Sequence, residues 1–552
     1  MSTLFTPWRR TQRRRAAASA AALLVGLFGH CAAQAQASVP QATGASAAFP
    51  ISGFEVKGDN PLSPQDVARV LAPFTGPNGN LLVLQQASAA LEDELKAQGF
   101  ALHRVSLPPQ EMGSRVTLLV VKFGIGQVSL EGNTRLSAAN IRASIPEIRE
   151  GEAPNLNALA IQTAIANENP GKQIQVSLKE STEADMIDIK VLVKEAAPWT
   201  FSVSVANTGS DTTGNDRVSV VGGYSNVFDL DQQFSGAYTT SVVRIKEVKQ
   251  LGLNYTIPLY QQGGVLGLSY TNSDVVGGFG TFTSTGAGQT FGVNFNYYLQ
   301  PDGGRHGFLT AALDQKIFNA SITNGAALAA GQPQRITSCP LSLGYTERVE
   351  SDSAQWSYST VAATNLSCGA GNDLSDYQNA NAGPATPDTR IHSSHWAALR
   401  GGGNYTSSFA TDWSWTARAQ FQYSAQALIS GEQFGLGGGS SVRGTAERPV
   451  SGDSGLSATL EITSSELYAG LRALGFVDAG WLRNNHPGVD PNKPAQDRLA
   501  SAGLGLRYAQ GPYSVSGDWA RVVQGSVLST TAGATIPHTG EQKLHVNLTA
   551  RF

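Results

Sequence analysis

The last nine residues, Leu544-His-Val-Asn-Leu-Thr-Ala-Arg-Phe552, alternate between apolar and polar side chains. Successive side chains of a β-strand point to opposite faces, so this segment has one apolar and one polar face. The same alternation recurs from Trp199 onward, for example at Phe201, Val203 and Val205. A membrane β-barrel needs this pattern, because lipid meets one face of each strand and the wet lumen meets the other.

The connections between these alternating segments are short and long in turn. Short connections fall at 226–232, 259–263, 301–306 and 464–466, and long ones at 319–335, 369–391 and 425–455. Short turns at one end and long loops at the other are typical of outer-membrane barrels. Residues 198–552 hold 16 candidate strands, an even number that returns Phe552 to the end where Trp199 starts.

Two copies of a shorter unit precede the barrel, at 51–123 and 124–197. They align at an offset of 74 residues, and the matched positions are Phe54, Val56, Gly58, Leu62, Ser63 and Val67 with Val128, Leu130, Gly132, Leu136, Ser137 and Ile141. Each copy predicts a strand, a helix capped by Ser63 or Ser137, a second helix and two closing strands. We therefore expect two small α+β domains with exposed strand edges.

The N-terminus has the composition of a signal peptide, which we place at residues 1–37. Five arginines between Arg9 and Arg15 precede an apolar run over 16–28, and small residues follow at Ala33, Ala35 and Ala37. The apolar run is too short to favour the alternative, a membrane anchor. Residues 38–50 then form a short linker.

Charge and cysteine content exclude several function classes. Without the five arginines of residues 1–37, the 39 basic residues fall to 34 against 42 acidic ones, a net charge of -8. An acidic exported chain without basic runs does not favour nucleic-acid binding. Cys339 and Cys368 are too few for a structural zinc site, but they flank a short turn near 351–353 almost symmetrically. We predict that they form a disulfide at the long-loop end of the barrel.

Two motifs in the late barrel carry a family resemblance. The stretch Phe434-Gly-Leu-Gly-Gly-Gly-Ser-Ser-Val-Arg-Gly-Thr445 holds Val442, Arg443 and Gly444, and Phe476-Val-Asp-Ala-Gly480 holds Phe476, Asp478 and Gly480. With the signal peptide, the repeats and the 16 strands, they resemble the TpsB transporters of two-partner secretion. These are the haemolysin and haemagglutinin secretion/activation proteins, relatives of the BamA-type insertases, and the paired α+β units resemble their POTRA domains.

The resemblance implies that the loop 425–455 folds back into the lumen. Its Arg443 would pair with Asp478 on the barrel wall and support secretion. The residue pattern agrees, because Asp478 shares a strand face with Phe476 and Gly480, and a carboxylate facing lipid would be very costly. Thr445 stands where the family often has an aromatic residue, so the resemblance does not extend to a contact made by that ring.

The resemblance also implies the partners and the compartment. POTRA-like domains in the periplasm of a Gram-negative bacterium would bind a secreted exoprotein through its N-terminal secretion domain. The barrel would lie in outer-membrane lipid, inserted by the barrel-assembly machinery, for which Phe552 resembles the C-terminal recognition signal. Many family members carry a helix that plugs the pore, but Pro40, Gly44 and Pro50 make the linker a poor helix, so we predict none here.

Three other functions remain as alternatives: a BamA-like insertase, a passive porin and an outer-membrane enzyme. An insertase predicts more repeats, and a porin leaves the repeats without a role. For an enzyme, Gly452-Asp-Ser-Gly455 matches a serine-protease nucleophile signature without a suitable histidine segment upstream, and His392 and His395 have metal-ligand spacing without an acidic or cysteine companion. We predict no catalytic residues, no metal and no cofactor.

Overall fold

The computed structural model describes residues 49–111, 113–209, 213–275, 277–279, 282–284, 287–319, 335–379, 387–487, 493–528 and 536–552. The predicted signal peptide and most of the linker lie outside these ranges. The chain divides into two compact units, one made of residues up to Glu94 with Arg104–Val121, the other of Leu95–His103 with Lys122–Phe552. No helix within the described ranges has the length and hydropathy of a membrane span.

The first repeat folds as the sequence predicts, with one addition. Ser63 caps its first helix by accepting a hydrogen bond of 3.1 Å from the backbone N–H of Asp66, and proline occupies the first helical position. A strand at Phe49–Ile51, within the predicted linker and its boundary, pairs with Gly76–Gly79. The elements are β1 (Phe49–Ile51), β2 (Gly53–Gly58), α1 (Pro64–Leu71), η1 (Ala72–Phe74), β3 (Gly76–Gly79), α2 (Leu81–Ala97), β4 (His103–Ser106) and β5 (Arg115–Lys122), and the main sheet has the order β2-β5-β4.

The second repeat has the same order of elements. Ser137 caps its first helix by accepting from the backbone N–H of Asn140 at 3.0 Å. The elements are β6 (Gly124–Glu131), α3 (Ala138–Ser144), α4 (Leu156–Asn167), β7 (Lys172–Glu180) and β8 (Met186–Glu195). The sheet order is β6-β8-β7, which leaves β7 at an edge, and a buried core of aliphatic residues lies between the sheet and the helices.

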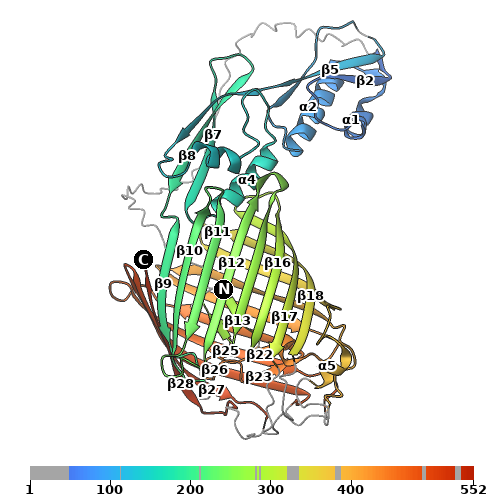
Figure 1. Ribbon diagram of the computed structural model, residues 1–552. Helices are drawn as coiled ribbons and strands as arrows, with labels where there is room; N and C mark the ends of the chain where they lie inside the picture. The colour runs from blue at the N-terminus through green and yellow to red at the C-terminus, as the bar shows by residue number, and fades with distance from the viewer. Residues whose placement is uncertain are drawn as a thin grey trace, which may run out of the picture. The chain divides into compact units, whose positions relative to one another are not determined.

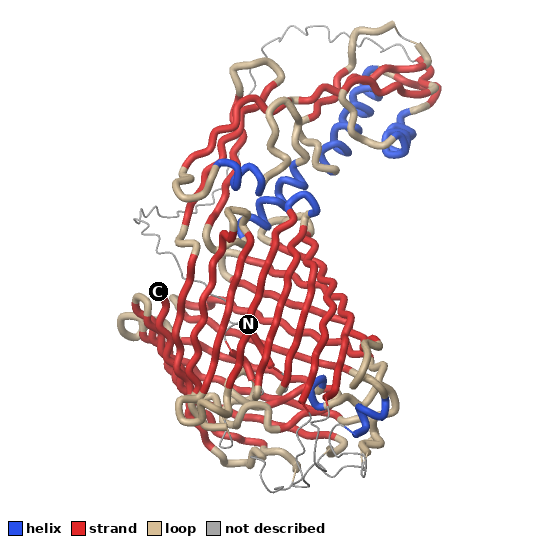
Figure 2. The backbone as a smooth tube through the Cα atoms, viewed as in Figure 1, coloured by secondary structure: helices blue, strands red, loops and turns tan. Residues whose placement is uncertain are grey.

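Within the described residues, sixteen antiparallel strands close into one barrel, as predicted (Figures 1 and 2). They are β9 (Trp199–Ala206), β10 (Arg217–Val227), β11 (Gln232–Thr240), β12 (Lys249–Leu259), β13 (Gly264–Ser273), β16 (Gly288–Tyr298), β17 (Arg305–Asn319), β18 (Arg335–Glu350), β19 (Ala354–Leu366), β20 (Ala397–Ala410), β21 (Trp413–Tyr423), β24 (Ser454–Thr463), β25 (Leu471–Arg483), β26 (Gln496–Gln510), β27 (Tyr513–Gln524) and β28 (Gln542–Arg551). Pairing of β28 with β9 completes the ring. Smaller elements lie in the connections: β14 (Gly277–Phe279), β15 (Phe282–Ser284), η2 (Tyr260–Gln262), α5 (Leu374–Asn379), η3 (Ser430–Glu432), β22 (Phe434–Leu436) and β23 (Val450–Gly452).

Alternation along the barrel strands separates an apolar exterior from a polar lumen. Leu544, Val546 and Leu548 are exposed on the outside of β28, whereas His545 between them is buried. Near the end of the barrel beside the second repeat, the rings of Trp356, Tyr405 and Trp415 contact one another on adjacent strands. Aromatic side chains at this level are typical of the membrane-water interface of such barrels.

A buried ionic junction joins the second repeat to the turns of the barrel. Lys172 of β7 pairs with Asp231, the last residue of the turn between β10 and β11. Asp231 also accepts hydrogen bonds from Asn140 at 3.0 Å and from the hydroxyl of Tyr260 at 2.8 Å. Burial lowers the pKa of Lys172 despite the attraction of Asp231. Because each of these polar groups has a partner, the junction holds the second repeat firmly at this end of the barrel.

Candidate functional site

The long connection between β21 and β24 folds against the inside of the barrel wall. Its short strands β22 and β23 pair as a hairpin, and this hairpin packs on β24 and β25. A Cβ atom on Gly480 would lie only 2.6 Å from a methyl carbon of Leu436, and one on Gly455 only 2.3 Å from the ring of Phe434. The glycines therefore leave the space in which the hairpin fits against the wall.

The tip of this loop places Arg443 on the predicted wall residue Asp478. The guanidinium binds the carboxylate through two parallel hydrogen bonds of 2.9 Å, from Nε to Oδ2 and from Nη2 to Oδ1. The backbone N–H of Arg443 donates a third at 3.1 Å. Asp478 is 2% and Arg443 4% exposed, so the pair is almost fully removed from water. Such bidentate, charge-assisted contacts are strong and directional.

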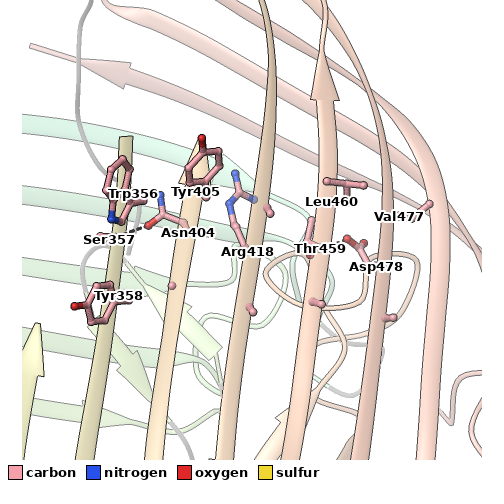
Figure 3. A pocket seen from close by; sticks show the side chains of 15 residues that line it. Trp356, Ser357, Tyr358, Asn404, Tyr405, Arg418, Thr459, Leu460, Val477 and Asp478 are labelled. Atoms are coloured by element: carbon pink, nitrogen blue, oxygen red, sulfur yellow. Dashed lines mark hydrogen bonds between the residues drawn. The ribbon is translucent and has the colours of Figure 1, made fainter. Parts of the chain in front are cut away.

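Neighbouring strands complete the surroundings of Asp478. Thr459 of β24 donates a hydrogen bond of 2.9 Å to its carboxylate, and Figure 3 shows these two side chains close together on adjacent strands. Ser501 of β26 donates another at 3.3 Å. Phe476, two residues before Asp478 and on the same face, lies under the guanidinium, whose Cζ is 3.3 Å from the ring centroid. In the predicted wall motif, Asp478 thus supplies the charge, Phe476 the surface on which the guanidinium stacks, and Gly480 the space for Leu436.

Val442 and Gly444 fix the direction of the loop on either side of Arg443. Val442 is fully buried and packs with Leu436, Leu482 and Leu499. Gly444 has a φ of 92°, which side-chain-bearing residues rarely adopt, and its N–H donates to His545 Nε2 at 3.1 Å. The hydroxyl of Thr445 donates to Val442 O at 3.0 Å and accepts from Gly438 N at 2.9 Å, so this residue closes the turn after Arg443.

Three residues of this site were not singled out from the sequence: Glu461, Asp518 and His545. Glu461 accepts from Arg443 Nη1 at 3.0 Å, and Asp518 lies 3.7 Å from the same atom. Each is a polar residue between apolar residues of its strand. This alternation could have placed the three side chains on the lumen face from the sequence alone. Their height in the barrel, which brings them to Arg443, depends on the strand register.

The other predicted positions lie elsewhere on the barrel. Cys339 and Cys368 form a disulfide with Cα atoms 6.2 Å apart. Phe552 directly follows β28; its N–H donates to Phe201 O at 2.8 Å, and its ring is exposed. These contacts place the terminal ring on the outer face, beside Phe201.

The enzyme-like fragments form no reactive arrangement. Asp453 is fully buried and accepts hydrogen bonds from the N–H of Leu428 and from Gln433, both at the base of the loop. The ring of His392 lies 4.4 Å from that of His486, centroid to centroid. In the described parts of the chain, no three His, Cys, Asp or Glu residues are grouped as metal ligands. The site is therefore a docking site for a loop inside the lumen.

Comparisons with known proteins agree with this architecture. The family model for the haemolysin secretion/activation proteins ShlB/FhaC/HecB matches residues 185–508, and the model for the ShlB-type POTRA domain matches residues 49–122. The outer membrane transporter CdiB of Escherichia coli is 24% identical over 476 residues, which cover 83% of this chain and 76% of the relative. The heme/hemopexin transporter protein HuxB of Haemophilus influenzae is 21% identical over 263 residues, covering 46% of this chain and 45% of the relative.

Solved structures show the same fold. The structure of CdiB from Escherichia coli matches with a TM-score of 0.66 at 19% identity and covers 94% of this chain and 93% of its own. CdiB from Acinetobacter baumannii matches with a TM-score of 0.66 at 16% identity, covering 92% and 90%.

Proposed function

The chain belongs to the haemolysin secretion/activation proteins of the ShlB/FhaC/HecB family, and from this premise we propose that it recognises one partner exoprotein in the periplasm and secretes it unfolded through its own barrel. Members of this family are two-partner secretion transporters of the outer membrane, with POTRA domains in the periplasm, and are not enzymes. We propose both the recognition of the exoprotein in the periplasm and its unfolded state during transit.

One observation carries the proposal: a loop is docked inside the lumen by a buried ion pair. The Arg443 site touches β24, β25 and β28, so the docked loop occupies space that a passenger would need. A passive porin requires a permanently open lumen. A docking site made of reversible contacts instead supports a channel whose loop rearranges while a chain passes.

The free edge of β7 is the surface that we propose for the exoprotein. This strand pairs with β8 on one side only. On the unpaired side of β7, the side-chain amide of Asn167 binds the backbone of Ile174. It accepts a hydrogen bond of 2.6 Å from the N–H of Ile174 and donates one of 3.1 Å to its carbonyl. Beyond it lie half-buried Val176 and exposed Leu178, whose side chains an added strand would cover. Strand addition gives affinity through main-chain hydrogen bonds with modest demands on sequence.

The energy for transport has to come from the passenger, because the periplasm provides no nucleotide. We propose that folding outside the cell prevents return of the chain. This mechanism assigns no chemistry to the barrel, in agreement with a lumen site composed of docking contacts.

Secretion of a candidate exoprotein, one carrying an N-terminal secretion domain, tests the proposal. Cells that express the chain with this exoprotein should release it into the medium, and cells without the chain should retain it. Depletion of the chain should leave other outer-membrane barrels at normal levels, whereas a loss of those barrels would favour an insertase. Uptake of small solutes at porin rates would favour a passive channel.

A further inference from the structure

A second ionic cluster lies at the base of the lumen loop, away from Arg443. Glu432, at the end of η3, is 2% exposed. Its carboxylate is 3.1 Å from Lys316 Nζ of β17 and accepts a hydrogen bond of 2.8 Å from Arg400 Nη2 of β20. Two basic side chains from the wall therefore bind one acidic side chain of the loop.

Backbone contacts strengthen the same attachment. The carbonyl of Glu432 accepts from Gln422 Nε2 at 2.9 Å and from Arg400 Nη2 at 3.2 Å. Gln422 belongs to β21, the strand from which the loop leaves, and it also donates to the carbonyl of Asp453 at 3.0 Å, next to the start of β24. The base of the loop is thus fastened both to the wall and to its own two ends.

The two clusters bind different parts of the wall. In the order around the barrel, β18 and β19 separate β17 from β20, and both cations of the Glu432 cluster come from these two flanking strands. The Arg443 cluster uses β24, β25 and β27, further along the ring. Glu432 and Arg443 are separated by only ten residues of loop, including β22. A release at one cluster therefore leaves the loop attached at the other.

We propose that Glu432 is a positioning residue, which clamps the base of the loop to β17 and β20 so that the lumen opens fully only when both clusters release. The inference deepens the proposed function, in which the loop occupies the lumen at rest. It applies to the channel itself and does not require the exoprotein. Removing the charge of Glu432 raises the open fraction of the channel, because Lys316 and Arg400 then lose the carboxylate that binds them directly and keep only the attraction of Asp314 nearby.

Single-channel recording of the full-length protein in planar bilayers tests the clamp. Glu432→Gln keeps the size of the side chain, and we expect it to raise the open-state occupancy by about tenfold or more, as for loss of a buried charge partner. Lys316→Met should also raise the open-state occupancy, because it removes a basic partner of Glu432. Glu350→Gln, at an exposed glutamate on the same barrel, is the matched control and should behave as wild type. A heat-dependent mobility shift on gels establishes that each variant is a folded barrel.

Two further variants separate positioning from general stability. In Glu432→Gln combined with Arg443→Ala, the open-state occupancy should rise by about the product of the two single effects, since the two clusters share no partner and each substitution frees one attachment. Reversal of all three charges, Glu432→Lys with Lys316→Glu and Arg400→Glu, should restore most of the closed state. Wild-type currents in folded Glu432→Gln, or a double variant no more open than Arg443→Ala, would overturn the clamp. Secretion of the exoprotein by wild type would stand in either case, which keeps the two proposals distinguishable.

Discussion

Replacing Arg443 by alanine is the sharpest test of the docked loop. The substitution leaves two carboxylates, Asp478 and Glu461, buried at 2% and 7% exposure without their shared cation. Removing one partner of a buried ion pair costs ~3–5 kcal/mol, because the other charge is stranded. Asp478 still accepts hydrogen bonds from Thr459 and Ser501, so we expect a cost at the lower end of this range. A loss of about 3 kcal/mol in docking free energy shifts the equilibrium roughly a hundredfold toward the undocked loop.

Asp478→Ala should have a smaller effect than Arg443→Ala. After this change Arg443 keeps Glu461 at 3.0 Å and Asp518 at 3.7 Å, so its charge is not stranded. The double variant should be little worse than Arg443→Ala alone, as expected for residues in contact. The barrel itself should remain inserted in all three variants, because its strand-to-strand hydrogen bonds do not involve the loop.

Secretion of the exoprotein is the measurement, with the outer-membrane levels of all variants matched. We expect secretion to fall more in Arg443→Ala than in Asp478→Ala, and little further in the double variant. Arg498→Ala, at an exposed arginine of β26, is the control and should secrete as wild type. Additive losses in the double variant would mean that the two charges act separately. Wild-type secretion by either single variant would refute a functional role of the pair.

Three further predictions concern other parts of the chain. Alkylation of the unreduced, denatured mature protein, from which Cys31 is removed with the predicted signal peptide, should find no free thiol, because Cys339 and Cys368 are bridged; two alkylated cysteines would contradict this. Deletion of Phe552 should lower the amount of heat-modifiable barrel in the outer membrane, and an undiminished amount would exclude a role in assembly. Burial raises the pKa of the Glu195 carboxyl, but the hydrogen bonds that it accepts from Leu136, Thr134 and Arg135 outweigh this effect and lower the pKa to about 2. Since this pKa is depressed, the stabilisation of residues 134–136 is complete above the unfolded value of about 4.3 and disappears as pH falls toward 2. The protection of their amides against hydrogen exchange, relative to the intrinsic rate at each pH, should fall over this range in wild type but not in Glu195→Gln, and equal profiles would contradict the assignment.

Local sequence was sufficient to predict much of this architecture. Alternation with a period of two assigns each side chain to the lumen or to lipid, so the sequence alone places Asp478 inside and Leu544 outside. Ser63 and Ser137 mark helix starts because their hydroxyls satisfy N–H groups only three residues away. The relation between Arg443 and Asp478 came from a resemblance, since spacing alone does not specify a contact across 35 residues.

Only the tertiary structure revealed the complete docking site. Period-two alternation gives the face of a residue but not its height or its position around the ring, and these depend on strand register and closure. Arg443 therefore meets Glu461 and Asp518, and Gly444 meets His545, although 101 residues separate the last two. For the same reason Glu432 joins Lys316 and Arg400, from strands that are not neighbours. Closing the sheet into a barrel brings these side chains to one lumen, where a single loop can contact several strands at once.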